Sequence, residues 1–248
     1  MILAFDFDGV ICDSAGETAL SGWEAAITIW PDMQSQKLNS DTIEAFRKCR
    51  PVLETGYQSI LINRLLHQGH SAETIISQSV QLFDDLIDTE SLDEQELIKC
   101  FGDTRDKWMD DDFESWLNVH AFYPGVVQKI NALARTYPVF VITTKEKRFA
   151  CALIEHAGLN IHESTVFGLE SGKKSAVLDS LSLNYPGQQI VFFEDRLKTI
   201  RKLVRPYLKT YLVNWGFTLA EDLQEAESVD HIRLISLVDF IKMPPESL

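Results

Sequence analysis

The sequence predicts an α/β fold: a Rossmann-like parallel sheet flanked by helices, with an all-helical domain inserted after the first strand. Three observations support this prediction. The chain begins with a short apolar run, Ile2 to Phe7, that is typical of a buried strand. A long stretch of helical pattern follows up to about residue 118. After it, β-rich apolar runs alternate with helices of about ten residues, the pattern of βαβ units.

The N-terminal half is expected to contain one strand and then helices. Gly9 follows the first strand as a turn, and Pro31 and Gly69 each end a helical pattern. Capping residues indicate where helices begin: Ser14 with Glu17, Asp41 with Glu44, Ser71, and Ser91 with Glu94. No β-rich run interrupts these segments, so the region is predicted to be all-helical.

The C-terminal half changes character at Pro124 and Gly125, which mark a turn. Four apolar runs are expected to be strands: 138–144, 164–168, 189–195 and 209–215. Helical patterns separate them, at 126–136, 147–158, 174–183 and 198–204. Strands that alternate with helices in this way form a parallel sheet, which the first strand is expected to join.

This organisation predicts two domains. Residues 1–14 and 119–248 form an α/β core, and residues 15–118 form a helical cap inserted after the first strand. A structureless loop of that length would be implausible in a compact protein. The alternative is two domains in series, which would leave the first strand without sheet partners. The insertion is therefore preferred.

Composition and charge exclude several classes of protein. The net charge of −14 argues against general binding to nucleic acid or to an anionic membrane. No apolar run approaches the roughly 20 residues that span a bilayer, and the N-terminus lacks the basic leader of a signal peptide. Four scattered cysteines without a CxxC pair favour reduced thiols in a cytoplasmic protein. The oligomeric state cannot be read from the sequence.

Polar side chains follow three of the expected strands, at the sheet edge where parallel α/β folds bind ligands. They are Asp6 and Asp8, Thr143 and Thr144, Glu194 and Asp195, together with the loop lysines Lys173 and Lys174. This set suits phosphoryl transfer. In such a reaction carboxylates hold Mg²⁺, and one carboxylate attacks phosphorus. A second carboxylate, two residues further along the chain, transfers protons. A lysine and a hydroxyl bind the phosphoryl oxygens.

The same residues resemble the motifs of the haloacid dehalogenase (HAD) superfamily. "DFDGVICDS" is similar to its first motif, "VITT" to its second, Lys174 in "GKKSAVL" to its third and "VFFEDR" to its fourth. "FYPGVVQKI" and "VNWGF" resemble stretches of the phosphoglycolate-phosphatase-like branch, which carries an inserted helical (C1-type) cap. The resemblance covers residues 1–14 and about 119–220.

The resemblance implies a role for each matching position. Asp6 is the nucleophile and a Mg²⁺ ligand, and Asp8 is the general acid and base with its main-chain carbonyl facing the metal. Thr143 binds the phosphoryl group with Thr144 beside it, Lys174 bridges phosphate and nucleophile, and Asp195 completes the metal shell.

Two departures from the family pattern leave alternatives open. Many relatives have a second acidic residue several positions after the fourth motif, and here none follows until Glu221. Glu194 is our choice for the outer metal ligand. Many relatives also have Lys-Pro in the third motif, so Lys173 rivals Lys174. In the cap, Arg50 either binds a substrate carboxylate or second phosphate, or belongs to a solvated basic patch; the second interpretation is preferred.

The function expected from these features is that of a Mg²⁺-dependent phosphatase for a small phosphorylated metabolite, with an aspartyl-phosphate intermediate and a cap that closes over the site. Two alternatives remain. One is a phosphomutase of the same superfamily, which returns the phosphoryl group to a sugar. The other is a HAD-like binding or regulatory protein without significant turnover.

Overall fold

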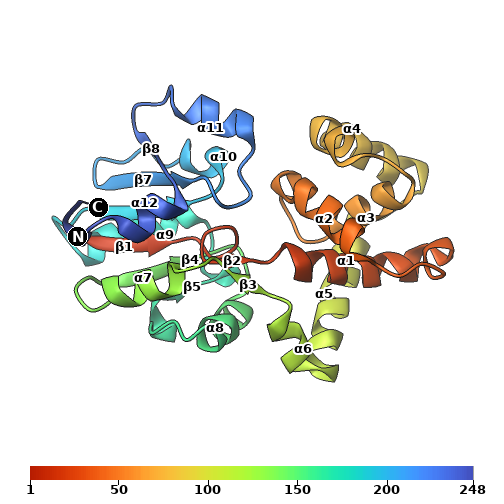
Figure 1. Cartoon of the computed structure of the whole chain (residues 1–248), viewed down its shortest axis with the longest axis horizontal. Coiled ribbons are helices and arrows are strands. Elements are labelled where there is room, and N and C mark those ends of the chain that lie inside the picture. The colour runs from red at the N-terminus through yellow and green to blue at the C-terminus, as the bar shows by residue number, and fades with distance from the viewer. Residues whose placement is uncertain (248) are drawn as a thin grey trace. The chain divides into compact units, whose positions relative to one another are not determined.

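The structure, a computed structural model, describes residues 1–247, and the chain divides into two compact units. One unit consists of Met1–Asp13 and the chain from Ala121 onward, and the other is Ser14–His120. Figure 1 shows the first as a sheet with flanking helices and the second as helices alone. The assignment of residues 15–118 as a cap domain remains a prediction.

The sheet has six parallel strands in the order β5-β4-β1-β6-β7-β8, which confirms the predicted fold class. β1 is central, between β4 and β6 (Figure 1). The strands are β1 (Ile2–Phe5), β4 (Val139–Ile142), β5 (Val166–Phe167), β6 (Ile190–Glu194), β7 (Leu208–Val213) and β8 (Ile232–Ile235). Sequence analysis did not predict β8, or the short antiparallel pair β2 (Cys12–Asp13) and β3 (Ala121–Phe122).

Alternate residues of the central strand face opposite sides of the sheet, as the period of a strand requires. Ile2 and Ala4 pack in a buried cluster with apolar residues of α9 (Lys174–Asn184). Phe5 is stacked on Phe193 of β6 at 4.7 Å, and both rings contact Phe240 of α12 (Leu237–Lys242). β1 is thus buried on both faces, which explains its uninterrupted apolar sequence.

The remaining helices of this unit connect the strands. They are α7 (Val126–Leu133), α8 (Lys147–His156), α10 (Leu197–Ile200) and α11 (Ala220–Ala226). Chain order along the sheet reverses at β1, since β4 and β5 lie on one side of it and β6, β7 and β8 on the other. Open α/β sheets bind ligands at the carboxyl ends of the strands next to such a reversal. The fold therefore directs attention to the residues that follow β1, β4 and β6.

The second unit is helical throughout and has its own apolar core. Its helices are α1 (Ala15–Ile29), α2 (Ser40–Cys49), α3 (Gln58–His67), α4 (Ala72–Thr89), α5 (Glu94–Asp111) and α6 (Phe113–Asn118). Trp23, Phe46 and Leu61 are among the buried residues of that core. Over residues 1–247, no helix has the length and apolar character needed to cross a membrane. All four cysteines are free, as predicted.

The predicted helix caps were right at one position and displaced at others. Ser71 caps α4 by accepting a hydrogen bond from the Thr74 N–H at 3.2 Å. Asn39 and Asp93 cap α2 and α5, each two residues away from the predicted cap. Local spacing alone did not distinguish these neighbouring polar residues.

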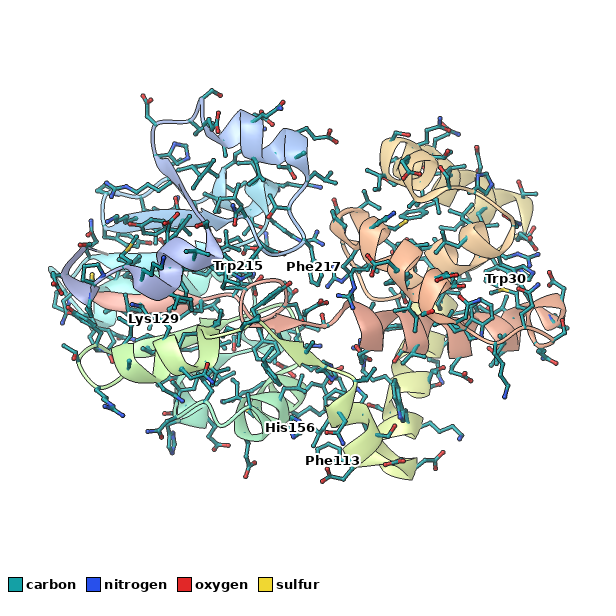
Figure 2. All side chains as sticks on the ribbon, viewed as in Figure 1. Trp30, Phe113, Lys129, His156, Trp215 and Phe217 are labelled. Carbon is teal, nitrogen blue, oxygen red and sulfur yellow. The ribbon has the colours of Figure 1, made fainter. Side chains whose placement is uncertain are left out.

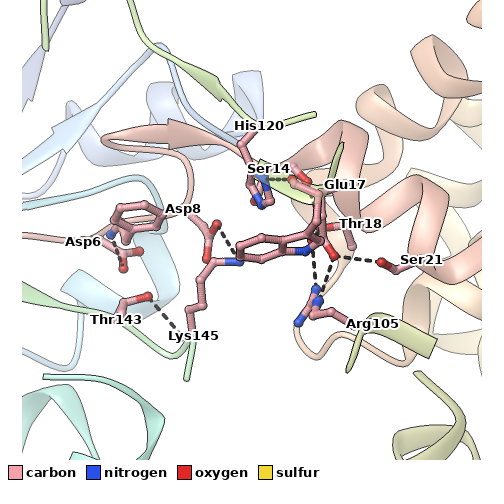
Figure 3. A network of polar contacts seen from close by, with 12 residues as sticks. Asp6, Asp8, Ser14, Glu17, Thr18, Ser21, Arg105, His120, Thr143 and Lys145 are labelled. Atoms are coloured by element: carbon pink, nitrogen blue, oxygen red, sulfur yellow. Dashed lines mark hydrogen bonds and ion pairs between the residues drawn. The ribbon is translucent and has the colours of Figure 1, made fainter. Parts of the chain in front are cut away.

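The capping box predicted for α1 does not form, although the helix begins where expected. Ser14 makes no side-chain capping hydrogen bond, and Glu17 is fully buried. Glu17 instead accepts two hydrogen bonds from Arg105 of α5, at 2.7 and 2.9 Å, and one from Ser21 at 2.8 Å (Figure 3). A buried, bidentate ion pair has replaced the local cap.

Candidate active site

Asp6 lies where β1 leaves the sheet, so the opening apolar run does not carry a charge in the middle of a strand. β1 ends at Phe5, and the Asp6 N–H still donates to the Phe193 carbonyl of β6 at 2.9 Å. The side chain is nonetheless buried, with 6% of the residue exposed. Its Oδ1 accepts a hydrogen bond from the Phe7 N–H at 2.8 Å. The backbone of the following turn thus fixes the orientation of the carboxylate.

Lys174, the first residue of α9, is the lysine that reaches Asp6. Its Nζ lies 2.9 Å from Asp6 Oδ1 and 2.7 Å from Glu194 Oε2, and its side chain is 11% exposed. Lys173 is exposed at the surface. Of the two lysines that the sequence left as alternatives, Lys174 is the one that lies beside Asp6, and its catalytic role stays a prediction.

The loop after β7 holds Asp195 through its backbone and a hydroxyl. The Phe217 N–H donates to Asp195 Oδ2 at 2.8 Å, and Thr218 Oγ1 donates to the Asp195 carbonyl at 2.6 Å. Trp215 in the same loop donates from Nε1 to the Val10 carbonyl at 3.1 Å, which ties it to the turn after Asp8 (Trp215 and Phe217 are labelled in Figure 2). Asp195 Oδ1 is buried and has no hydrogen-bond partner within residues 1–247.

The residues present fit a divalent metal ion. Asp6, Glu194 and Asp195 are all buried, and each offers a carboxylate oxygen within 4.8 Å of the other two. The buried Asp195 Oδ1 without a partner is a free ligand atom. Asp6, Glu194 and Asp195 bring more negative charge to the site than the ammonium of Lys174 neutralises, and a divalent cation would reduce that excess.

Glu194 is the less available of the expected metal ligands. Its Oε2 accepts from Lys174, and its Oε1 accepts from the backbone N–H groups of Asp195 and Arg196, both at 3.2 Å. Both oxygens therefore already have donors, whereas Asp195 Oδ1 has none. The arrangement suits Glu194 to hold Lys174 in place, and its role as a direct metal ligand remains a prediction.

Burial and mutual repulsion shift the pKa values of this cluster. Burial, with the neighbouring Glu194 carboxylate, raises the pKa of Asp6 to about 7 although Lys174 opposes the shift. Burial also raises the pKa values of Glu194 and Asp195. Burial alone would lower the pKa of Lys174, but Asp6 and Glu194 together raise it, so this lysine is a permanent cation. The ionised carboxylates of the site are therefore destabilised, and a bound cation would stabilise them.

Thr143 follows β4 beside the central strand, and its hydroxyl is oriented by the backbone. Thr143 is buried, and Oγ1 accepts a hydrogen bond from the Lys145 N–H at 3.0 Å. The hydroxyl hydrogen stays available for an acceptor such as a phosphoryl oxygen. Thr144 is exposed. Lys145 was missed by sequence analysis: its Nζ lies 3.5 Å from Asp8 Oδ1 (Figure 3).

Arg50 belongs to the helical unit and is not a solvated surface residue. Only 9% of it is exposed, and its Nη1 donates to the Leu53 carbonyl at 3.5 Å. The preferred interpretation, a solvated basic patch, is wrong for this residue. Its part in substrate binding stays a prediction.

The close approach of Gly216 to Asp195 gives a test of the loop after β7. A Cβ at position 216 would lie 2.6 Å from Asp195 Cβ and would also meet the Gly9 carbonyl. Gly216→Ala should therefore displace Asp195, lower kcat/KM by about 10-fold or more and destabilise the fold by about 1–3 kcal/mol. Phosphate-release kinetics and thermal unfolding would measure both effects.

Gly102→Ala is the matched control for that substitution. Gly102 lies within α5, and nothing lies within 4 Å of an added Cβ. This variant should be more stable by about 1 kcal/mol and keep wild-type kinetics. Unchanged kinetics in Gly216→Ala would contradict the placement of Asp195 by this loop.

The raised pKa of Asp6 gives a pH-dependent stability that a substitution can isolate. In the metal-free protein, folded Asp6 binds a proton up to about pH 7, whereas the unfolded residue loses it near 3.8. The folded state therefore binds more protons in this window, and its stability falls as pH rises through it. Between pH 5 and pH 8, Asp6→Asn should lose less stability than wild type. Mg²⁺ should stabilise wild type more at pH 8 than at pH 5. If stability falls equally with pH in the two proteins in chelator, the raised pKa of Asp6 is contradicted.

A family model describes the class of protein that this fold and site define. The model of haloacid dehalogenase-like hydrolases matches residues 1–201, and the chain belongs to that family. It is a hydrolase with the α/β fold of the family, as the sequence motifs predicted. No curated protein matches the chain.

Solved structures share the fold at low sequence identity. A "predicted phosphoglycolate phosphatase" from Haemophilus somnus is 16% identical, with a TM-score of 0.65 over 98% of this chain and 96% of that one. A "predicted phosphatase" from Clostridium acetobutylicum is 14% identical, with a TM-score of 0.58 over 97% and 96%. A hydrolase from Pseudomonas syringae is 12% identical, with a TM-score of 0.56 over 95% and 93%.

Proposed function

We propose that this hydrolase is a Mg²⁺-dependent phosphatase that acts on a small phosphorylated metabolite through an aspartyl-phosphate on Asp6. The observation that carries the proposal is the pairing of Asp6 with Lys174 beside a buried carboxylate oxygen of Asp195 that has no partner. A nucleophilic carboxylate, a fixed cation and a free metal ligand are what transfer of an anionic phosphoryl group requires. The solved structures named as phosphatases agree with this class of reaction.

In the first step, an oxygen of Asp6 forms a bond to phosphorus while the bond from phosphorus to the ester oxygen breaks. Asp6 Oδ1 is held by Lys174 and by the Phe7 N–H, so the carboxylate is presented in one orientation. Asp8 gives its proton to the leaving oxygen. The products of this step are the free alcohol and an aspartyl-phosphate.

In the second step, water attacks phosphorus and gives a proton to Asp8, and the bond between phosphorus and Asp6 breaks. Inorganic phosphate leaves, and both side chains return to their starting states, Asp6 as a carboxylate and Asp8 as a carboxylic acid. Lys174 and the Thr143 hydroxyl hold the phosphoryl oxygens during both steps. Asp6, Asp195 and the Asp8 carbonyl would hold Mg²⁺, with Glu194 as an outer ligand, and the bound ion would offset the charge of the phosphoryl group.

The test is phosphate release from p-nitrophenyl phosphate and a broad panel of metabolite phosphates. The purified protein should release phosphate in Mg²⁺ and should lose that activity in chelator. Inactivity across the whole panel, in wild type as in Asp6→Asn, would contradict the proposal. Closure of the helical unit during turnover, and the cytoplasmic location expected from the cysteines, stay predictions.

A further inference from the structure

Trp215 is an aromatic side chain of the α/β unit that the proposed reaction does not use. It lies in the loop after β7, and its Nε1–H donates to the Val10 carbonyl at 3.1 Å (Trp215 is labelled in Figure 2). Val10 belongs to the turn that carries Asp8, two residues earlier in the chain. An indole has one polar atom, a donor, so this single hydrogen bond gives the side chain a definite polar contact.

The ring of Trp215 also packs against the C-terminal helix α12. The ring centroids of Trp215 and Phe240 lie 5.6 Å apart, with 31° between the ring planes. Phe240 is buried and contacts Phe5, the last residue of β1, and Phe193 of β6, with centroids 6.0 and 5.2 Å apart. Trp215 is therefore connected through one aromatic ring to the two strands that end at the site.

The turn that carries Asp8 is closed by its own backbone. The N–H groups of Ile11 and Cys12 both donate to the Phe7 carbonyl, at 2.9 and 3.0 Å. The hydrogen bond from Trp215 reaches this turn from another part of the chain. Because the turn is tightly closed, a shift of the carbonyl that Trp215 holds would move Asp8 with it.

The same loop holds Asp195 through different residues. The Phe217 N–H donates to Asp195 Oδ2, and Thr218 Oγ1 donates to the Asp195 carbonyl. Neither bond involves the side chain of Trp215. The loop thus makes two separate contacts, one with the expected metal ligand and one with the turn of Asp8, and each can be removed by its own substitution.

We propose that Trp215 is a positioning residue for proton transfer: its N–H, with the ring packed on Phe240, holds the turn of Asp8 so that this carboxyl group meets the ester oxygen. The inference rests on the proposed phosphatase function and goes beyond it by giving the C-terminal helix α12 a part in proton transfer. A misplaced acid slows the departure of a basic leaving oxygen, which needs a proton. It has little effect on a leaving group that departs readily as an anion.

Two esters of similar size test the proposal: phenyl phosphate, whose leaving oxygen is the more basic, and p-nitrophenyl phosphate. Trp215→Phe removes the N–H and keeps an aromatic ring beside Phe240. It should lower kcat/KM about 10-fold for phenyl phosphate and less than about 3-fold for p-nitrophenyl phosphate. Its affinity for Mg²⁺, measured by calorimetry without substrate, should equal that of the wild type.

Thr218→Val is the matched control from the same loop. It removes the hydroxyl that donates to the Asp195 carbonyl and keeps a side chain of similar shape. This variant should bind Mg²⁺ more weakly and should lose kcat/KM by the same factor on both esters. Thermal unfolding of the two variants would confirm that each is folded.

Three results would overturn the proposal. Equal losses on the two esters in Trp215→Phe, with Mg²⁺ binding weakened as in Thr218→Val, would make Trp215 a general support of the site. Unchanged kinetics on both esters would show that the hydrogen bond does not position Asp8. Release of phosphate from no monoester by the wild type would overturn the phosphatase function and this inference with it. If Trp215→Phe does not fold, Trp215→Leu, which also lacks the N–H, is judged by the same criteria.

Discussion

Asp6→Asn should reduce kcat by about 10⁴-fold or more, because an amide cannot form the covalent intermediate. The same substitution should make the metal-free protein more stable at pH 8, by about 1–3 kcal/mol, because it removes a buried charge with a pKa raised to about 7. Activity and stability would therefore change in opposite directions. Phosphate release and thermal unfolding in chelator measure the two effects.

A control separates loss of the nucleophile from general damage to the site. The side-chain amide of Asn still offers an oxygen to Lys174 and to the Phe7 N–H, so the contacts of Oδ1 can persist. Folded Asp6→Asn should bind inorganic phosphate in Mg²⁺. Retention of more than about a tenth of wild-type kcat by Asp6→Asn would show that Asp6 is not the nucleophile.

Lys174→Met should damage both the fold and the reaction. It removes the cation between Asp6 and Glu194 and leaves two carboxylates buried without it. Breaking a buried ion pair in this way typically costs about 3–5 kcal/mol. Loss of a fixed charge at the phosphoryl oxygens should reduce kcat by a further factor of about 10²–10³ in protein that remains folded.

Lys173→Met is the matched control for Lys174→Met, since the neighbouring lysine is exposed. It should change the free energy of unfolding by no more than about 0.5 kcal/mol and leave activity unaltered. The double variant Lys174→Met/Glu194→Gln removes one of the uncompensated carboxylates and should recover stability but not activity. Similar behaviour of the two lysine variants would contradict the assignment of Lys174.

Much of the core fold was predictable because its signals are local and strong. Parallel strands buried on both faces have continuous apolar sequences, and β1, β4 and β6 were each found in this way. β7 was found from the apolar residues Tyr211, Leu212 and Val213 at its end. β8 was missed because it is a four-residue strand at the sheet edge in which the exposed Arg233 interrupts the apolar residues, so that "IRLI" is a weak signal. Asp6, Lys174 and Asp195 were predictable because they follow strands or begin helices with recognisable patterns.

Other features depend on tertiary contacts that no local pattern reveals. Glu17 has capping-box spacing but pairs with Arg105, which lies 88 residues away. Lys145 follows two threonines as an ordinary loop lysine would, and only the approach of Asp8 makes it a buried cation. The pairing of Glu194 with Lys174 likewise became visible only when β6 and α9 were placed together. Long-range pairing of charges is the part of a site that sequence spacing predicts least.

The most direct test of the account is to look for a phosphoryl group on Asp6. Asp8→Asn should slow the release of phosphate, while p-nitrophenyl phosphate, whose leaving group needs little protonation, should still phosphorylate the enzyme. After acid quenching of this variant in Mg²⁺, peptide mass spectrometry should find one added phosphoryl group on the peptide that contains Asp6, and none in Asp6→Asn. Two results would contradict the account if the wild type turns over substrate. One is quenched Asp8→Asn with no phosphoryl group on Asp6, and the other is a phosphoryl group on another residue of that variant.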